Sequence, residues 1–148
     1  MPEPYDLQRF LDAQQMVYAD VVSELSQGRK RTHWMWFIFP QIAGLGLSAM
    51  ARRFAIASRD EASAYLAHAI LGPRLSECVS LVLAVEGRTI NEILGSPDDI
   101  KFRSSMTLFG AVSDNPIFDQ AIARYFAGGK DQATLEILTQ LDRKRPAP

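Results

Sequence analysis

The sequence contains a single cysteine among its 148 residues, and this scarcity sets the first limits on the protein. One thiol, Cys78, cannot form a disulfide within the chain or a zinc site built from several cysteines. An excess of charge of one sign is also lacking, since 16 basic and 17 acidic side chains leave a net charge of −1. No overall field therefore draws the protein towards nucleic acid, which would need a local basic patch.

Long hydrophobic runs are missing as well. No stretch approaches the roughly 20 apolar residues that cross a bilayer, and the first residues, MPEPYDLQRF, lack the basic and apolar regions of a signal peptide. We therefore expect a cytoplasmic protein without a membrane partner. The motifs GxxxxGK[ST], HExxH, GxSxG and CxxC are absent from the sequence, so we expect neither a metal site nor a bound cofactor.

Apolar residues recur at three- and four-residue steps through most of the chain, a spacing typical of amphipathic helices. The first helix is expected within 6–27, and later helices are bounded by capping residues, prolines and glycines, as at 96–99. A chain of this length buries about two-thirds of its unfolded surface. The pattern predicts an all-α, compact single-domain bundle of about seven to eight short helices over 1–148, with a frayed tail at 142–148.

One segment fits two kinds of secondary structure. Residues 33–39, HWMWFIF, are aromatic and branched, which favours a strand. A short buried helix, capped by Thr32 and ending before Pro40, fits its surroundings better, because few other strands are available to pair with it. A minor β element at 33–39 is the alternative.

Residues 28–49 hold the densest group of chemically useful side chains. A basic run at 29–31 is followed closely by His33, Trp34 and Trp36. Cations beside aromatic planes suit a ligand with a phosphate and a ring, because the charges hold the phosphate while an indole stacks on the ring. The same pattern fits a solvated basic corner, with at least one tryptophan in the core.

Gly44 and Gly46 fall in the letters GLGLSA, which match the GxGxxA pattern of dinucleotide-binding loops. The strands that should flank such a loop are missing from the pattern, so a Rossmann site is disfavoured. Two glycines before a helix can still expose backbone N–H groups to an anion. A tight turn that lets two helices approach is the structural alternative.

The stretch DDIKFRSSMTLF at 98–109 places polar groups on an otherwise apolar helix. Lys101 precedes Ser104 and Ser105 by three and four positions, beside an acidic pair. Serine–lysine couples serve in nucleophilic catalysis, but the order Ser-x-x-Lys is absent, so hydrogen bonding to a ligand is favoured. Helix capping by the aspartates, with Lys101 in solvent, is the alternative.

Three further polar residues lie in apolar or motif-rich surroundings. Gln14 interrupts an apolar stripe, and because a buried amide without partners costs about 1–3 kcal/mol, it bonds either to a neighbouring loop or to a ligand. His33 and His68 are the only histidines. They form an acid–base pair if the fold brings them together, and are otherwise separate structural residues. A helix C-terminus at His68 would favour its imidazolium form.

Five segments together resemble the DUF1810 family, a group of small, cytosolic, mainly bacterial proteins of uncharacterised function. The segments are DLQRFLDAQ (6–14), GRKRTHWMWFIFPQIAGLG (28–46), YLAHAILGPRL (65–75), ILGSPDDIKFRSSMTLFG (93–110) and FDQAIARYFAGGKDQATLEIL (118–138). Ala69 departs from the family, whose members often have proline there. The resemblance implies a mostly helical single domain and no particular activity. The calpastatin label of some members does not fit, because such inhibitors are long, polar and repeated.

The favoured hypothesis is a domain or enzyme that binds a small anion, such as a nucleotide or an ADP-ribose derivative. The expected ligand contacts are Gln14, Lys30, Trp34, Trp36, Gln41, Gly44, Gly46, His68, Ser104 and Ser105. The expected proton-transfer residues are His33, Asp99 and Lys101. One alternative is a protein-interaction module, with an unknown partner, in which 33–39 is partly exposed. A second alternative, nucleic-acid binding, is disfavoured by the net charge.

Overall fold

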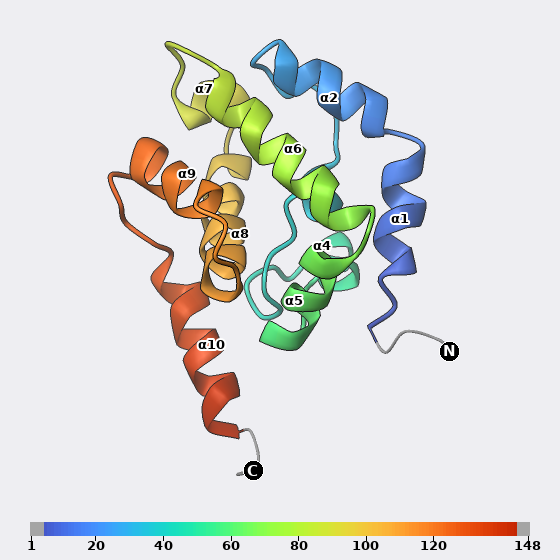
Figure 1. Ribbon diagram of the computed structural model, residues 1–148, viewed down its shortest axis with the longest axis vertical. Helices are drawn as coiled ribbons and strands as arrows, with labels where there is room; N and C mark the ends of the chain where they lie inside the picture. The colour runs from blue at the N-terminus through green and yellow to red at the C-terminus, as the bar shows by residue number, and fades with distance from the viewer. Residues whose placement is uncertain (1–4, 145–148) are drawn as a thin grey trace.

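In the computed structural model, residues 5–144 are described and form ten α-helices joined by short loops (Figure 1). The helices are α1 (Gln8–Gln15), α2 (Tyr18–Ser26), α3 (Met35–Ile38), α4 (Ala49–Arg53), α5 (Arg59–Ala67), α6 (Leu71–Ala84), α7 (Ile90–Leu94), α8 (Asp98–Val112), α9 (Ile117–Phe126) and α10 (Gln132–Lys144). No strand occurs in this range, where Ile42 and Ile56 form an isolated parallel bridge. The prediction of an all-α fold is confirmed.

The helices outnumber the seven or eight expected, partly because the first apolar stripe is broken into α1 and α2. The N–H of Val17 bonds to the carbonyl oxygen of Gln14, 3.0 Å away, and Val17 has a φ of −123°. The apolar spacing continues across this break, so it carries no sign of the turn. Two short helices at an angle therefore replace the single helix expected within 6–27.

The aromatic segment forms a helix, and the β alternative at 33–39 is not observed. Met35, Phe37 and Ile38 are all buried on α3. Thr32 does not cap this helix, contrary to expectation. Its hydroxyl donates instead to the carboxylate of Glu24, 2.7 Å away.

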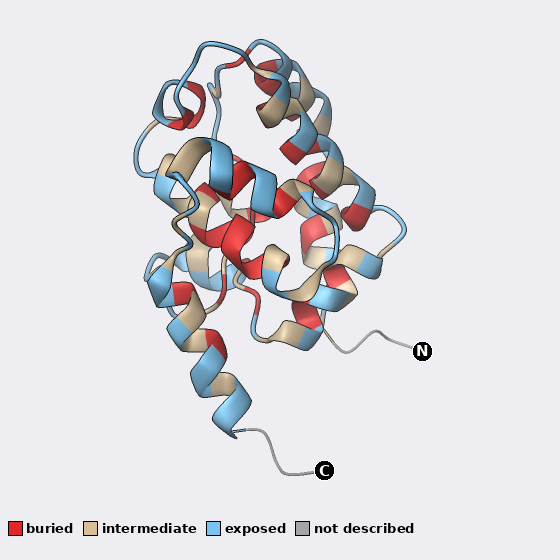
Figure 2. Ribbon diagram, turned by 60° about the vertical axis from the view of Figure 1, so that its left-hand side comes forward, coloured by how far each residue is buried: buried red, intermediate tan, exposed pale blue. Residues whose placement is uncertain are grey.

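The last helix, α10, is joined to the body of the molecule at its start and again near its end. The N–H of Asp131 donates to the Thr107 hydroxyl, 2.9 Å away, and one Asp131 carboxylate oxygen accepts from both Ser104 and the Thr134 N–H. Only Thr134 and Leu138 of this helix are buried, and the helix extends from the main group of helices (Figures 1 and 2). Near its end, Asp142 pairs with Arg59 at the start of α5, 3.0 Å away. The helix continues to Lys144, into the tail expected to fray, and 145–148 lie outside the described residues.

The core is assembled around α8, which packs against α5, α7, α9 and α10. Every residue from Ser104 to Phe109 is buried, so the middle of this helix is covered on all sides. Ring pairs extend the packing, with centroids 4.9 Å apart for Phe39 and Phe102 and 5.4 Å apart for Tyr65 and Phe109. The buried residues gather between the helices in Figure 2. The N-terminal end of α8 remains accessible, and that end contributes to the candidate site.

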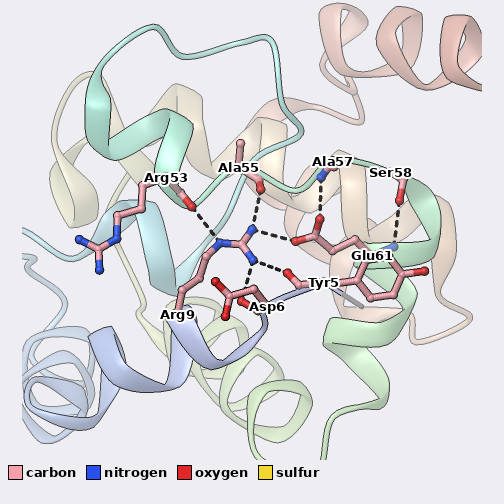
Figure 3. A network of polar contacts seen from close by, with 8 residues as sticks. All are labelled: Tyr5, Asp6, Arg9, Arg53, Ala55, Ala57, Ser58 and Glu61. Carbon is pink, nitrogen blue, oxygen red and sulfur yellow. Dashed lines mark hydrogen bonds and ion pairs between the residues drawn. The ribbon is translucent and has the colours of Figure 1, made fainter. Parts of the chain in front are cut away.

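Arg9 ties the N-terminal helix to the loop before α5 (Figure 3). A guanidinium has five N–H groups, and those of Arg9 donate to five acceptors. The acceptors are Glu61 Oε2 and the carbonyl oxygens of Tyr5, Asp6, Arg53 and Ala55. The Glu61 carboxylate lies 2.8 Å from Arg9, and its other oxygen accepts from the Ala57 N–H. Arg9 is thus fully used by the fold.

Replacing Glu61 with alanine should lower the free energy of unfolding by about 3 kcal/mol, because the Arg9 guanidinium then lies largely buried without its carboxylate. Asp142→Ala is the matched control, since Asp142 pairs with Arg59 at a much more exposed position, and it should cost less than about 1 kcal/mol. Denaturant unfolding of both variants measures the difference. Equal losses would contradict a structural role specific to the Arg9–Glu61 pair.

Candidate functional site

A buried carboxylate, Glu24 on α2, organises the segment that carries several predicted site residues. It accepts hydrogen bonds from the N–H groups of Arg31 (2.6 Å) and Thr32 (2.9 Å), from the Thr32 hydroxyl (2.7 Å) and from Trp34 Nε1 (3.1 Å). Glu24 was not among the site residues predicted from the sequence. The available signal was a charged residue three positions after Val21, on the buried stripe of its helix.

The Glu24 carboxylate stays ionised despite its burial. Burial acts to raise the pKa of Glu24, but the hydrogen bonds from Thr32, Arg31 and Trp34 outweigh this effect and lower the pKa. The indole of Trp34 is held in the core, where the residue is 1% exposed. Lys30 Nζ lies 5.0 Å from the centroid of that ring. Trp34 is therefore a core residue that packs beside Lys30, and its ring is not accessible to a ligand.

Beside this segment, a surface depression of about 300 Å³ lies between α3 and the start of α8, and we call it the lysine depression. It is lined by Lys30, His33, Met35, Trp36, Ser96, Pro97, Asp98 and Lys101. Lys30 Nζ is 2.9 Å from one oxygen of Asp98, and Lys101 Nζ is 3.9 Å from the other. Lys101 Nζ is also 5.4 Å from the ring centroid of the half-buried Trp36. Two ammonium groups thus share one carboxylate, and His33 is exposed at the edge.

A second depression, of about 280 Å³, adjoins the first, and we call it the apolar depression. It is lined by Gln41, Leu45, Gly46, Pro97, Ile100, Lys101, Ser104, Asp131 and Ala133. Pro97 and Lys101 line both depressions. The surface is therefore continuous, with a cationic part and an apolar part.

The two depressions bring together about half of the predicted site residues. Those in their linings are Lys30, His33, Trp36, Gln41, Gly46, Lys101 and Ser104. The others, Gln14, Trp34, Gly44, His68, Asp99 and Ser105, are not among the lining residues of either depression. Their hydrogen bonds and packing explain most of these positions.

Gln14 bonds within the core. Its Nε2 donates to the Phe37 carbonyl oxygen (2.7 Å) and to the Tyr65 hydroxyl (3.0 Å), and its Oε1 accepts from Arg74 (3.3 Å). These partners lie on α3, α5 and α6, so the amide fixes α1 against three other helices. The packing role considered for this residue accounts for all of these contacts.

His68 lies at the corner between α5 and α6, and it does not line the depression that His33 lines. Its Nδ1 accepts from the N–H groups of Ile70 (3.1 Å) and Leu71 (3.3 Å), which satisfies donors at the start of α6. The side chain therefore caps the start of α6 and has a structural role.

Within 5–144, no single helix is long and apolar enough to cross a bilayer, and α5 and α6 meet the criterion only as a pair bent by 88°.

Gly44 and Gly46 are both explained by the geometry of their loop. Gly44 has a φ of 107°, which favours glycine. A Cβ on Gly46 would lie 2.4 Å from the Cβ of Ala51. The following helix, α4, has only five residues, and the Ser48 hydroxyl already caps it by accepting from the Ala51 N–H. The loop is therefore a tight turn against α4, and its Gly46 lines the apolar depression.

The remaining polar groups of α8 have different surroundings. The Ser104 hydroxyl lies 3.1 Å from Asp131 Oδ2, and Asp99 accepts from the Asn91 side chain at 3.1 Å. Ser105 is fully buried, and among the described residues its hydroxyl has no hydrogen-bond partner.

Neither a reactive thiol nor a metal cluster is evident in the part of the chain that the structure describes. Burial raises the pKa of the Cys78 thiol to about 12, so it is not a nucleophile near neutral pH. No group of three or more His, Cys, Asp or Glu side chains within 5–144 is arranged to hold a metal ion. The candidate site is therefore the surface formed by the lysine and apolar depressions, whose linings contain lysine, histidine, serine and amide groups.

These features define an all-helical protein with a shallow surface site of lysine, tryptophan and histidine beside a buried aromatic segment. The chain belongs to the DUF1810 family of proteins of unknown function, whose model matches residues 4–138. It is similar to the crystal structure of the conserved hypothetical protein Rv1873 from Mycobacterium tuberculosis, with 54% identity, coverage of 93% of this chain and 99% of that chain, and a TM-score of 0.92. No curated protein matches the chain. The family resemblance seen in the sequence is confirmed.

Replacing Glu24 with glutamine should cost about 1–3 kcal/mol of unfolding free energy, because the amide presents donors to groups that themselves donate. The folded-state pKa of Glu24 is lowered. The stabilisation that the ionised Glu24 carboxylate gives to the folded state should therefore be fully present above the ordinary glutamate pKa of about 4.3. It should fade as the pH falls through the lowered pKa. Denaturant unfolding from about pH 7 to about pH 3 measures this loss.

The control is Glu136→Gln on the exposed face of α10, which should change stability by less than about 0.5 kcal/mol. The Glu24→Gln variant should lose less stability on acidification than the wild type does. An identical pH dependence for the two proteins would argue against an ionised, hydrogen-bonded Glu24.

Proposed function

We propose that the protein binds a small phosphorylated anion, such as a nucleotide or an ADP-ribose derivative, in the lysine depression. The observation that carries this proposal is the sharing of the Asp98 carboxylate by Lys30 and Lys101. One carboxylate balances one of the two ammonium charges, so a positive charge remains for a ligand. A surface hollow lined in this way concentrates anions near it.

Lys101 is the better placed of the two lysines to bind a ligand. Its side chain is 26% exposed, against 8% for Lys30. Its ammonium lies 3.9 Å from Asp98, too far for a short hydrogen bond, whereas Lys30 is paired at 2.9 Å. A phosphate oxygen gives Lys101 a charge-assisted hydrogen bond, while Lys30 keeps Asp98 in position.

The start of α8 adds to the positive field at this place. The helix has 15 residues, and its N-terminal end carries a partial positive charge directed at the depression lined by Ser96 and Pro97. The carboxylates of Asp98 and Asp99, both in the first turn, offset part of this field. The balance suits a phosphate ester better than a highly charged polyanion, and this weighs against nucleic-acid binding.

His33 and Trp36 have separate roles in the proposed binding of a ligand. His33 is exposed at the edge of the depression, and histidine is the side chain that exchanges protons near neutral pH, so we assign any proton transfer on the ligand to it. Trp36 forms part of the wall and Trp34 is buried, so a ligand changes the surroundings of Trp36 first.

The burial of most residues in 33–39 weakens the alternative that this segment is a protein-binding surface.

Titration with ADP and ADP-ribose should give a saturable change in tryptophan fluorescence that weakens as salt is raised. Lys101→Met should lower the affinity at least about tenfold, because a charge-assisted hydrogen bond is lost. Trp36→Phe should remove most of the fluorescence change while calorimetry still detects binding.

The matched control is Lys144→Met, an identical change of charge at the exposed end of α10, which should leave binding unaltered. The proposal fails if neither compound gives a saturable signal. It also fails if the Lys101 and Lys144 variants bind equally well.

A further inference from the structure

We infer that the apolar depression receives the base of a nucleoside phosphate whose phosphate group lies in the lysine depression. This inference rests on the proposed function, because it places the phosphate at Lys101. The two depressions share Pro97 and Lys101, which lie one helical turn apart at the start of α8. One small molecule can therefore reach both depressions, with its sugar near the shared residues.

Apolar side chains that remain exposed to water favour a ring in the second depression. Its lining includes Leu45, Ile100 and Ala133. Ile100 is 59% exposed, and Ala133 is exposed as well. Covering such groups with the flat face of a base removes apolar area from water and is favourable.

The polar residues of this depression match the edge of a base and disfavour a phosphate. The Asp131 carboxylate repels an anion, which directs the phosphate to the lysine side. Gln41 contributes an amide, a group that hydrogen-bonds well to the edge of adenine. The distribution of charge thus sets the orientation of the ligand, with its phosphate in the lysine depression and its base in the apolar depression.

The ring of Trp36 is a less suitable place for the base. The Lys101 ammonium already lies 5.4 Å from the centroid of that ring, so the indole interacts with a cation at this point. Trp36 then forms the wall beside the phosphate. The apolar depression is therefore the more suitable place for the base.

Calorimetry of the full chain with AMP, ribose 5-phosphate and inorganic phosphate tests the inference. Ribose 5-phosphate matches AMP except for the base, so AMP should bind at least about tenfold more tightly, from the apolar area that its ring covers. Ala133→Leu should fill the depression and abolish this preference while ribose 5-phosphate binds as before. Ala123→Leu, an equal enlargement at an exposed position of α9, is the control and should bind like the wild type.

The outcomes separate the two proposals. If AMP and ribose 5-phosphate bind equally and both are weakened by Lys101→Met, the inference about the base is overturned and the phosphate site stands. A preference for AMP that survives Ala133→Leu overturns the placement of the base in the apolar depression. If none of the three compounds binds, both proposals are overturned. Circular dichroism and melting curves of each variant establish that it is folded.

Discussion

The buried carboxylate of Glu24 is the interaction on which the candidate site depends. An ionised group removed from water is costly unless hydrogen bonds replace its hydration. Donors from Arg31, Thr32 and Trp34 provide that replacement, and all lie within four consecutive residues. The segment that follows Lys30 is therefore held in one conformation. Because the binding groups are ordered in advance, a ligand does not have to supply the entropy of ordering them.

Much of the fold could be predicted from the sequence because its signals are local. At the start of α7, Thr89 and Glu92 form a capping box by bonding to each other's backbone, an arrangement that needs only the local pattern Thr-x-x-Glu. The break between α1 and α2 was missed, since the apolar stripe continues through Val17. The aromatic segment was ambiguous because its residues are buried on nearly every side, which removes the periodicity that separates a helix from a strand.

The candidate site was harder to predict, because it depends on contacts between distant segments. Lys30 and Lys101 were each predicted as site residues from their residue type and local surroundings. No pattern in the sequence shows that both lie near the carboxylate of Asp98. Polar residues in apolar surroundings gave a mixed signal: Gln14 is bonded within the core, whereas Ser104 lies in the lining of a depression. A buried hydrogen bond and a ligand contact require the same residue types, so the sequence alone does not distinguish them.

The contacts that hold α10 differ between its two ends, so its turns differ in local stability. Its first turn is tied to α8 through Asp131, whereas its last turns are held by the partly buried Leu141 and by the exposed pair of Asp142 with Arg59 on α5. Amide hydrogens of the outer turns are therefore expected to exchange with solvent through local openings that leave the first turn intact. Ala133 lies in that first turn, so the wall that it gives to the apolar depression is insulated from motion at the far end. Variation in the outer part of α10 therefore affects the Asp142–Arg59 pair before it affects the surface beside Ala133.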